Sequence, residues 1–420
     1  MDIYISIAIF IAVMTAIVTE KVHRAVAAVA GAVLLLLTHV ITFDEAISHV
    51  DFNTLGVLLG MMLFVAVVKN SGLFEYVAIR AAKWAKGDPW KIMVAFMIIT
   101  AVFSAMLDNV TTVLLVAPMT ITITRILNVD PIPFLMTQIL SSNIGGTSTL
   151  IGDPPNIMIG SATGLDFMDF LSNDGIPAVI ILVAVVGLMR FVYGKKLNVD
   201  QMAVEEVMRL DEKKAIKDAA LLKKSIVMII LVAAGFVLHG QLGIDSSVVA
   251  LTAASVIMII GKQNAEEIIF DVEWPTIIFF LGLFIVVGGM VETGFIDSVA
   301  KLLINATAGY PVVTMLVLLW ASAILSAILD NIPFVATLIP LIQTMGDSGI
   351  DTYPLWWAIS LGACLGGNGT LIGASANVVV ASISDKNGFP ITFRSYLKVG
   401  FPTMIFTVAI ATVYMLIRYA

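Results

Sequence analysis

The chain has 420 residues, of which 59% are hydrophobic and only 13% are charged, with a formal net charge of −7. A soluble domain carries about 25% charged residues, so this composition excludes a soluble globular protein and indicates an integral membrane protein. No basic stripe points to nucleic acid as a partner, and the single cysteine, Cys364, excludes an internal disulfide framework.

Apolar stretches that could cross a bilayer recur along the chain, because a spanning helix needs about 20 mostly apolar residues. Ten spans are predicted, over residues 3–19, 24–41, 53–69, 131–164, 175–193, 222–239, 244–261, 275–293, 354–384 and 397–417. The stretches 131–164 and 354–384 are too long and too rich in glycine for plain helices. The sequence therefore predicts an all-α membrane fold with two broken helices.

Two further apolar stretches, 91–127 and 311–347, each carry an Asp-Asn pair near the middle. Each is predicted to be a hairpin, and hydropathy does not separate a re-entrant hairpin from two full spans. Either arrangement returns the chain to its starting side, so the rest of the topology is unaffected.

Basic residues orient the chain, because short cytoplasmic loops retain positive charge. They cluster between residues 80 and 91 and in the polar segment 194–224, which includes Lys195 and Lys196. The acidic connection 165–174 is expected on the other side. This distribution of basic and acidic residues predicts a multi-pass protein of the cell (inner) membrane with both termini outside. Segment 194–224 is predicted to be an amphipathic cytoplasmic linker between residues 1–193 and 225–420.

The two halves repeat each other in sequence. Residues 104–118, SAMLDNVTTVLLVAP, match residues 326–340, SAILDNIPFVATLIP, at seven of fifteen positions. Residues 145–156, GGTSTLIGDPPN, match residues 366–377, GGNGTLIGASAN, at seven of twelve. In this predicted topology the chain crosses inward through span 53–69 and outward through span 275–293, so the repeats are predicted to be inverted. Inverted repeats with interrupted helices are typical of secondary transporters, whose sites lie near the membrane midplane.

The helix breaks and hairpin tips are the candidate binding site. Non-helical backbone survives at membrane depth only where protein or a watery cavity surrounds it, and freed carbonyls suit a cation while freed amides suit an anion. Close packing of small residues is the alternative explanation for the glycines. The candidates in the breaks are Gly146, Thr147, Thr149, Gly152, Asp153, Asn156, Gly367, Asn368, Thr370, Gly373 and Asn377.

Asp108 and Asp330 lie at the two hairpin tips. A carboxylate at membrane depth is costly and is therefore a functional candidate, although Asp and Asn also cap ordinary surface turns. The remaining tip candidates are Ser104, Asn109, Thr111, Thr112, Ser326 and Asn331, and each Asp-Asn tip is a candidate sodium site.

Asp153 has no acidic counterpart, because Ala374 occupies the equivalent position of the second half. Two roles remain open for it, a proton or cation carrier and the N-cap of a half-helix that begins at Pro154. Asp108, Asp153 and Asp330 are the proton-coupling candidates. Glycine-rich residues 145–152 lack the Gly-Lys-Ser/Thr ending of a phosphate loop, so ATP-driven pumping is not supported and an ATPase subunit cannot be inferred.

These motifs make the chain resemble the ion transporter superfamily, in particular its arsenite permease and pink-eyed dilution (P) protein branch. The resemblance is carried by LDNVTTVLL (107–115) and NIGGTSTLIGDPPN (143–156), and by LDNIPFVATLIP (329–340) and GGNGTLIGASAN (366–377). The chain is more distantly similar to the divalent anion/sodium symporters. That similarity implies re-entrant hairpins, broken helices, a homodimer and elevator-type motion.

In those symporters a Ser-Asn-Thr triplet at each hairpin tip helps to bind sodium and carboxylate. Here the matching residues are 107–109 and 329–331, each reading Leu-Asp-Asn. Two added acids and no basic residue in the predicted site disfavour a multiply charged carboxylate. We therefore expect a secondary active transporter, without a cofactor, that exports arsenite or antimonite in exchange for protons. Sodium/proton antiport and sodium-coupled anion symport are the alternatives, and a channel-like or scaffold protein gains nothing from paired broken helices.

Overall fold

The computed structural model describes residues 2–19, 21–194, 199, 201–307 and 310–420. Within these residues all regular structure is helical, and nine helices are long and apolar enough to cross a membrane. The protein is thus a multi-pass membrane protein with the predicted all-α fold. Lys195 and Lys196 of the predicted linker lie outside the described residues.

The first half begins with a helical pair and ends with a broken helix and a long helix. Its elements are α1 (Asp2–Thr19), α2 (Arg24–Leu37), α3 (Phe43–Ser48), α4 (Phe52–Lys69), α5 (Leu73–Trp84), α6 (Pro89–Met106), α7 (Asn109–Ile126), α8 (Ile132–Thr147), α9 (Pro154–Thr163), α10 (Phe167–Phe170) and α11 (Ile176–Tyr193). A π-helical turn, Leu171–Gly175, joins α10 to α11. The expected outer connection 165–174 is therefore mostly helical, and it buries Asp174 completely.

The second half repeats this order of helices. Its elements are α13 (Ala219–Leu242), α14 (Ser246–Gly261), α15 (Ala265–Phe270), α16 (Trp274–Glu292), α17 (Phe295–Ala306), α18 (Pro311–Ile328), α19 (Asn331–Asp347), α20 (Tyr353–Gly366), α21 (Ser375–Lys386) and α22 (Phe393–Tyr419). Individual backbone angles also recur at equivalent positions of the two halves. Gly72 before α5 and Gly294 before α17 have φ values of 82° and 71°, a left-handed conformation that glycine adopts without strain.

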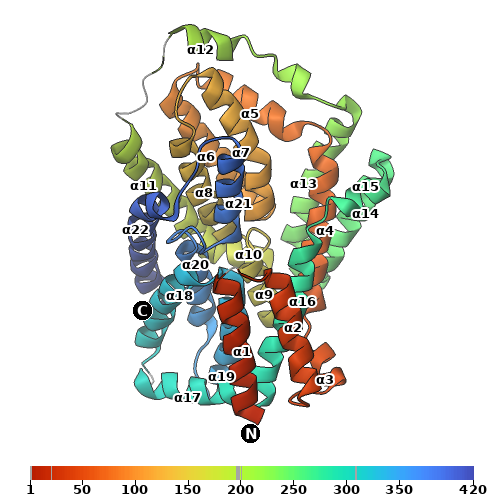
Figure 1. Cartoon of the computed structure of the whole chain (residues 1–420), viewed down its shortest axis with the longest axis vertical. Coiled ribbons are helices and arrows are strands. Elements are labelled where there is room, and N and C mark those ends of the chain that lie inside the picture. Colours follow the sequence, from red (N-terminus) through yellow and green to blue (C-terminus); the bar gives the residue numbers. More distant parts are fainter. Residues whose placement is uncertain (1, 20, 195–198, 200, 308–309) are drawn as a thin grey trace.

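The repeated elements point to opposite ends of the molecule (Figure 1). The α6–α7 hairpin and α5 occupy the upper part of the view, while the α18–α19 hairpin and α17 occupy the lower part. The two halves are therefore inverted repeats, as the basic residues predicted.

Both hairpins turn inside the protein. The chain leaves α6 at Leu107 in an extended conformation and enters α7 after Asp108, and it does the same at Leu329 and Asp330. Asp108 is only 7% exposed, and residues of both tips line one shared cavity. Because the hairpins come from opposite ends and their tips meet, each is re-entrant and neither is a pair of full spans.

Two repeated glycines allow close helix packing. A Cβ on Gly60 of α4 would lie 2.6 Å from the backbone of Ala250 on α14, and a Cβ on Gly282 of α16 would lie 2.7 Å from the backbone of Ala28 on α2. Close packing of small residues thus explains these two glycines, and each crossing brings two helix backbones close together.

The described part of the linker packs against α5. It contains α12 (Gln201–Met208) and a 3₁₀ turn, Glu212–Ala215, and it crosses the upper end of the molecule (Figure 1). Lys83 of α5 donates a hydrogen bond of 2.6 Å to Glu212, and this contact holds the pKa of the Glu212 carboxyl below its usual value. The linker is therefore anchored to the first half.

Candidate functional site

Each broken helix brings two backbone segments into contact. A Cβ on Gly152 would lie 2.5 Å from the carbonyl oxygen of Gly146 and 2.7 Å from that of Ser104. In the second half, a Cβ on Gly373 would lie 2.9 Å from the carbonyl oxygen of Gly367. These glycines therefore allow the break to fold back on itself and against the neighbouring hairpin.

We expect Gly152→Ala to destabilise the protein. Its methyl group would meet two backbone carbonyls that cannot move independently, and overpacking of this kind costs about 1–3 kcal/mol. Gly187→Ala is the matched control, because a Cβ there meets nothing within 4 Å. Thermal unfolding in detergent should show a lowered midpoint for Gly152→Ala alone, and equal midpoints for both variants would contradict this account of the break.

Two asparagines hold the carbonyls that the breaks release. The Nδ2 of Asn156 lies 3.1 Å from the carbonyl oxygen of Thr147 and 3.0 Å from that of Thr149. The Nδ2 of Asn377 likewise donates to the carbonyls of Gly367, at 2.7 Å, and Thr370, at 2.9 Å. These side chains thus satisfy the broken backbone from within the protein, in the same way in both repeats.

The predicted hydroxyl candidates mainly join the breaks to the hairpins. Ser104 and Ser326 donate to the carbonyls of Ser142 and Ala363, at 2.6 and 2.7 Å. Thr149 and Thr370 donate back to carbonyls at the ends of α6 and α18, at 2.6 and 2.5 Å. The hydrogens of these hydroxyls are therefore used in holding each hairpin against its break.

Three other predicted residues lie in the buried interior beside the breaks. Thr147 donates to the carbonyl of Asn143 at 2.7 Å. The Oγ1 of Thr112 and the Nδ2 of Asn368 are buried and have no hydrogen-bond partner among the described residues. Both atoms are therefore free to contact a bound ion or water.

The tip aspartates cap the helices that follow them, and they are also enclosed. Asp108 accepts hydrogen bonds from the backbone N–H of Thr111, at 2.7 Å, and from its hydroxyl, at 2.5 Å. Asp330 accepts one from the N–H of Ile332 at 3.1 Å and one from Ser375 at 2.8 Å. The capping explanation and a binding role are thus compatible at both tips.

Asp153 does not cap α9. Its carboxylate makes no hydrogen bond to the helix that follows, and it reaches the opposite repeat. The Nδ2 of Asn331 lies 3.1 and 3.2 Å from its two oxygens, and Asp153 is only 1% exposed. Of the two roles left open by the sequence, the N-cap is therefore wrong for this side chain.

The two tips and the first break enclose a small central cavity. Its volume is about 20 Å³, enough for one water molecule or one bare ion. Its lining includes Asp108, Asn109, Asp153, Glu273 and Asn331. Among the described residues no three His, Cys, Asp or Glu side chains approach closely enough to hold a metal ion. The cavity is thus acidic, small and built from both repeats.

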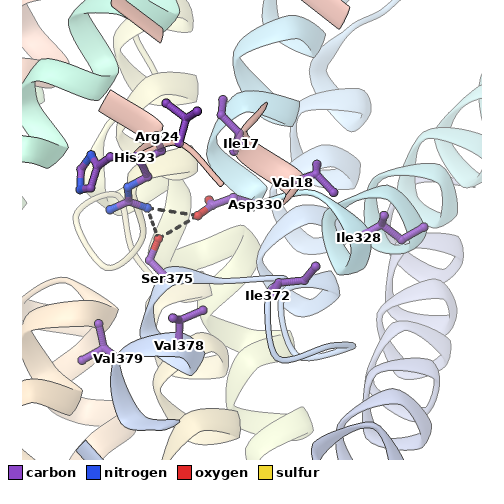
Figure 2. Close-up of a pocket in the computed structure, with 11 residues that line it drawn as sticks. Ile17, Val18, His23, Arg24, Ile328, Asp330, Ile372, Ser375, Val378 and Val379 are labelled. Atoms are coloured by element: carbon purple, nitrogen blue, oxygen red, sulfur yellow. Dashed lines mark hydrogen bonds and ion pairs between the residues drawn. The ribbon is translucent and has the colours of Figure 1, made fainter. Parts of the chain in front are cut away.

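Arg24 is a site residue that the sequence analysis missed. Its Nη1 lies 3.3 Å from Asp330 and also contacts Ser375, while its Nη2 lies 3.1 Å from the hydroxyl of Thr276. Figure 2 shows Arg24, Asp330 and Ser375 pointing toward one another, and all three line a cleft of about 320 Å³. Arg24 and Ser375 line both this cleft and the central cavity, so they lie between the two. The expectation that the site contains no basic residue is therefore wrong.

The sequence analysis also missed two more residues of the site, Asn143 and Glu273. Asn143 accepts from Asn109 at 3.2 Å and donates to Asn368 and Asn377, both at 3.0 Å, so it joins the repeats through four amides. Glu273 lies 222 positions after Asp51, so the repeat spacing could have revealed this acidic pair. Arg24 had no such signal, since Ser246 occupies the equivalent position.

Re-entrant hairpins and broken helices around a cavity shared by inverted repeats define a secondary transporter. A family model described as a citrate transporter, CitMHS, matches residues 14–362. The chain belongs to this CitMHS family, within the ion transporter superfamily.

Relatives with known sequences agree with this assignment. The chain is 40% identical over 424 residues to an uncharacterised transporter of Mycobacterium tuberculosis, with 99% of this chain and 98% of the relative covered. It is 31% identical over 500 residues to the human P protein, with 99% of this chain and 60% of the relative covered. The predicted resemblance to P proteins is confirmed, and the chain is a transporter and not an enzyme.

A solved structure shares the fold. The crystal structure of the Alcanivorax borkumensis YdaH transporter superposes with a TM-score of 0.60 at 14% identity, covering 89% of this chain and 87% of that chain. At this identity the likeness concerns the fold alone.

Proposed function

We propose that the chain is a cation-coupled secondary transporter that carries a proton, or a sodium ion, on the carboxylates of the central cavity. The observation that supports it is the cavity itself. Asp108, Asp153 and Glu273 surround a space of about 20 Å³, with Arg24 as the basic side chain of the described lining. Carboxylates enclosed in this way favour a positive charge, and the space fits a single ion or water.

Arsenite or antimonite efflux in exchange for protons is our proposal for the transported solute. The cleft beside Arg24 is large enough, at about 320 Å³, for a small inorganic solute to approach the central cavity. Sodium/proton antiport is the second candidate, favoured because the central cavity has room only for an ion. Arg24 also supplies the positive charge that a carboxylate substrate such as citrate would need, so sodium-coupled anion symport is the third.

The remaining parts of the proposal concern the assembly and its motion. Residues 1–193 and 225–420 would form the two repeats joined by the linker 194–224. In an elevator-type cycle the hairpins and broken helices would move against the closely packed α4–α14 and α2–α16 pairs. We further propose a homodimer in the cell membrane, with both termini outside and the basic linker in the cytoplasm.

Loss of the Asp108 charge should abolish transport. The test is pH-dye flux in proteoliposomes, with sodium or arsenite added separately to identify the solute. Asp108→Ala also removes a helix cap worth about 1 kcal/mol, so Asp88→Ala, which removes the cap of α6 outside the cavity, is the control. We expect no flux for Asp108→Ala and normal flux for Asp88→Ala, and unchanged flux in Asp108→Ala would contradict the proposal.

A further inference from the structure

A second acid lies buried outside the central cavity. Asp174 is 0% exposed, and the π-helical turn that joins α10 to α11 directs it into the protein. π-Helical turns of this kind are frequent at functional sites. One carboxyl oxygen, Oδ2, lies 2.5 Å from the hydroxyl of Ser360 on α20, and the other has no hydrogen-bond partner among the described residues.

Ser360 connects this acid to the first helix break. The Ser360 hydroxyl lies 2.7 Å from the Oδ1 of Asn156. The amide hydrogens of Asn156 point to the carbonyls of the break, which fixes its Oδ1 toward Ser360. The Oδ1 can only accept a hydrogen bond, so the hydrogen between Asn156 and Ser360 must come from the hydroxyl.

The number of hydrogens available for these two hydrogen bonds then determines whether Asp174 is protonated. A serine hydroxyl carries one hydrogen, and Ser360 uses it on Asn156. The short contact between Ser360 and Asp174 must therefore take its hydrogen from the carboxyl group. Ionisation would also place a negative charge on a fully buried carboxyl group, one oxygen of which has no hydrogen-bond partner among the described residues, at a high cost in free energy. Among the described residues no basic side chain forms an ion pair with it.

We propose that Asp174 holds a proton in this conformation, and that this proton orders the first break through Ser360 and Asn156. When the proton leaves, Ser360 turns its hydrogen to the carboxylate, and the Oδ1 of Asn156 keeps only its longer contact with the Sγ of Cys364, at 3.6 Å. Asp174 is thus a positioning residue for the carbonyls of Thr147 and Thr149, distinct from the carboxylates of the central cavity.

Other titratable groups surround this chain of hydrogen bonds. They are Asp169 on α10, His239 on α13, Tyr353 and Cys364 on α20, and Tyr414, Arg418 and Tyr419 on α22. Arg418 is the cation among them, and its guanidinium lies over the rings of Tyr414 and Tyr419. Among these groups only the Asp174 carboxyl is hydrogen-bonded to Ser360, so its proton is the one that sets the direction of that hydrogen bond.

Infrared spectroscopy of the purified protein tests the protonation directly. Near neutral pH the wild type should show the carbonyl band of a buried protonated carboxylic acid, and Asp174→Asn should lose it. Ser360→Ala should keep the band but shift it, because the acid loses its hydrogen-bond acceptor. A spectrum that is identical in the wild type and both variants would overturn the proposal, and this measurement needs no transported solute.

The functional link rests on the proposed transport, and it is tested by the pH profile of flux in proteoliposomes. The apparent affinity of the wild type for sodium should fall as pH rises, because proton loss loosens the break. Asp174→Asn keeps a permanent donor to Ser360 and should lose this fall, and Ser360→Ala should lose it too. Wild-type pH profiles in both variants would overturn the link, while absence of flux in the wild type would count against the proposed function alone.

Discussion

Asp153→Asn should reduce transport by about 10- to 100-fold while the protein still folds. The carboxylate is buried and caps no helix, and both of its oxygens accept from the Nδ2 of Asn331. The replacement has nearly the same shape, and rotation of the Asn331 amide restores one hydrogen bond. The substitution therefore removes mainly the negative charge of the side chain. Interactions with charged groups contribute roughly 1.5–3 kcal/mol, and each 1.4 kcal/mol is about tenfold in affinity.

The control for Asp153→Asn is Asp218→Asn. Asp218 occupies the same N-cap position on α13, where its side chain accepts from the N–H groups of Ala220 and Leu221. Asparagine caps helices about as well as aspartate, so transport and folding should both persist. Ion flux in proteoliposomes and thermal unfolding in detergent measure the two effects. If Asp153→Asn transported within a few-fold of the wild type, a charge at this position would not be needed.

Arg24→Ala should destabilise the protein and open the central cavity to the neighbouring cleft. The guanidinium pairs with Asp330 at 3.3 Å, and the two side chains are 26% and 12% exposed. Removing it leaves a mostly buried carboxylate without its cation, and it removes the side chain that separates the two cavities. We therefore expect a faster leak of a pH gradient from proteoliposomes in the absence of any solute.

A double-mutant cycle isolates the Arg24–Asp330 interaction. Alanine at each position and at both should give a coupling energy of about 1.5–3 kcal/mol, since the pair is largely sheltered from water. The matched control is the surface pair of Lys69 and Asp271, 3.4 Å apart and 49% and 46% exposed, for which we expect about 0–1 kcal/mol. The coupling energies are measured by reversible unfolding in mixed micelles. Equal values for the two pairs would show that the Arg24–Asp330 pair stabilises the protein no more than a surface ion pair does.

The repeats made much of the fold predictable. Two motifs at a constant spacing, together with the basic residues between them, indicated inverted halves with interrupted helices. Hydropathy did not show whether residues 91–127 form a re-entrant hairpin or two full spans, because apolar helices have the same hydropathy in both arrangements. The cavity that residues of both hairpin tips line, which is a tertiary property, decides it.

The hairpin tips and helix breaks of the site were predictable from the sequence, whereas Arg24, Glu273 and Asp174 escaped prediction. The tips and breaks recur in both halves, and the structure gathers Asp108, Asp153 and Asn331 around one cavity. Arg24 comes from a helix start without a repeated partner, and it reaches the site only because α2 packs against α16 and its side chain extends to Asp330. Asp174 lies in a stretch whose acidic composition resembles an exposed connection, and a local π-helical turn buries it.

The attachment of the linker to α5 makes the two repeats unequal in their contacts. Lys83 and Glu75 of α5 pair with Glu212 and Lys217, and a Cβ on Gly72 would meet the carbonyl of Ala215 at 2.0 Å. In the described part of the chain, α17 pairs with no comparable segment at the opposite end. The linker thus adds ion pairs to α5 that α17 lacks in the described part of the chain, so two helices of matching shape are held in place by different contacts.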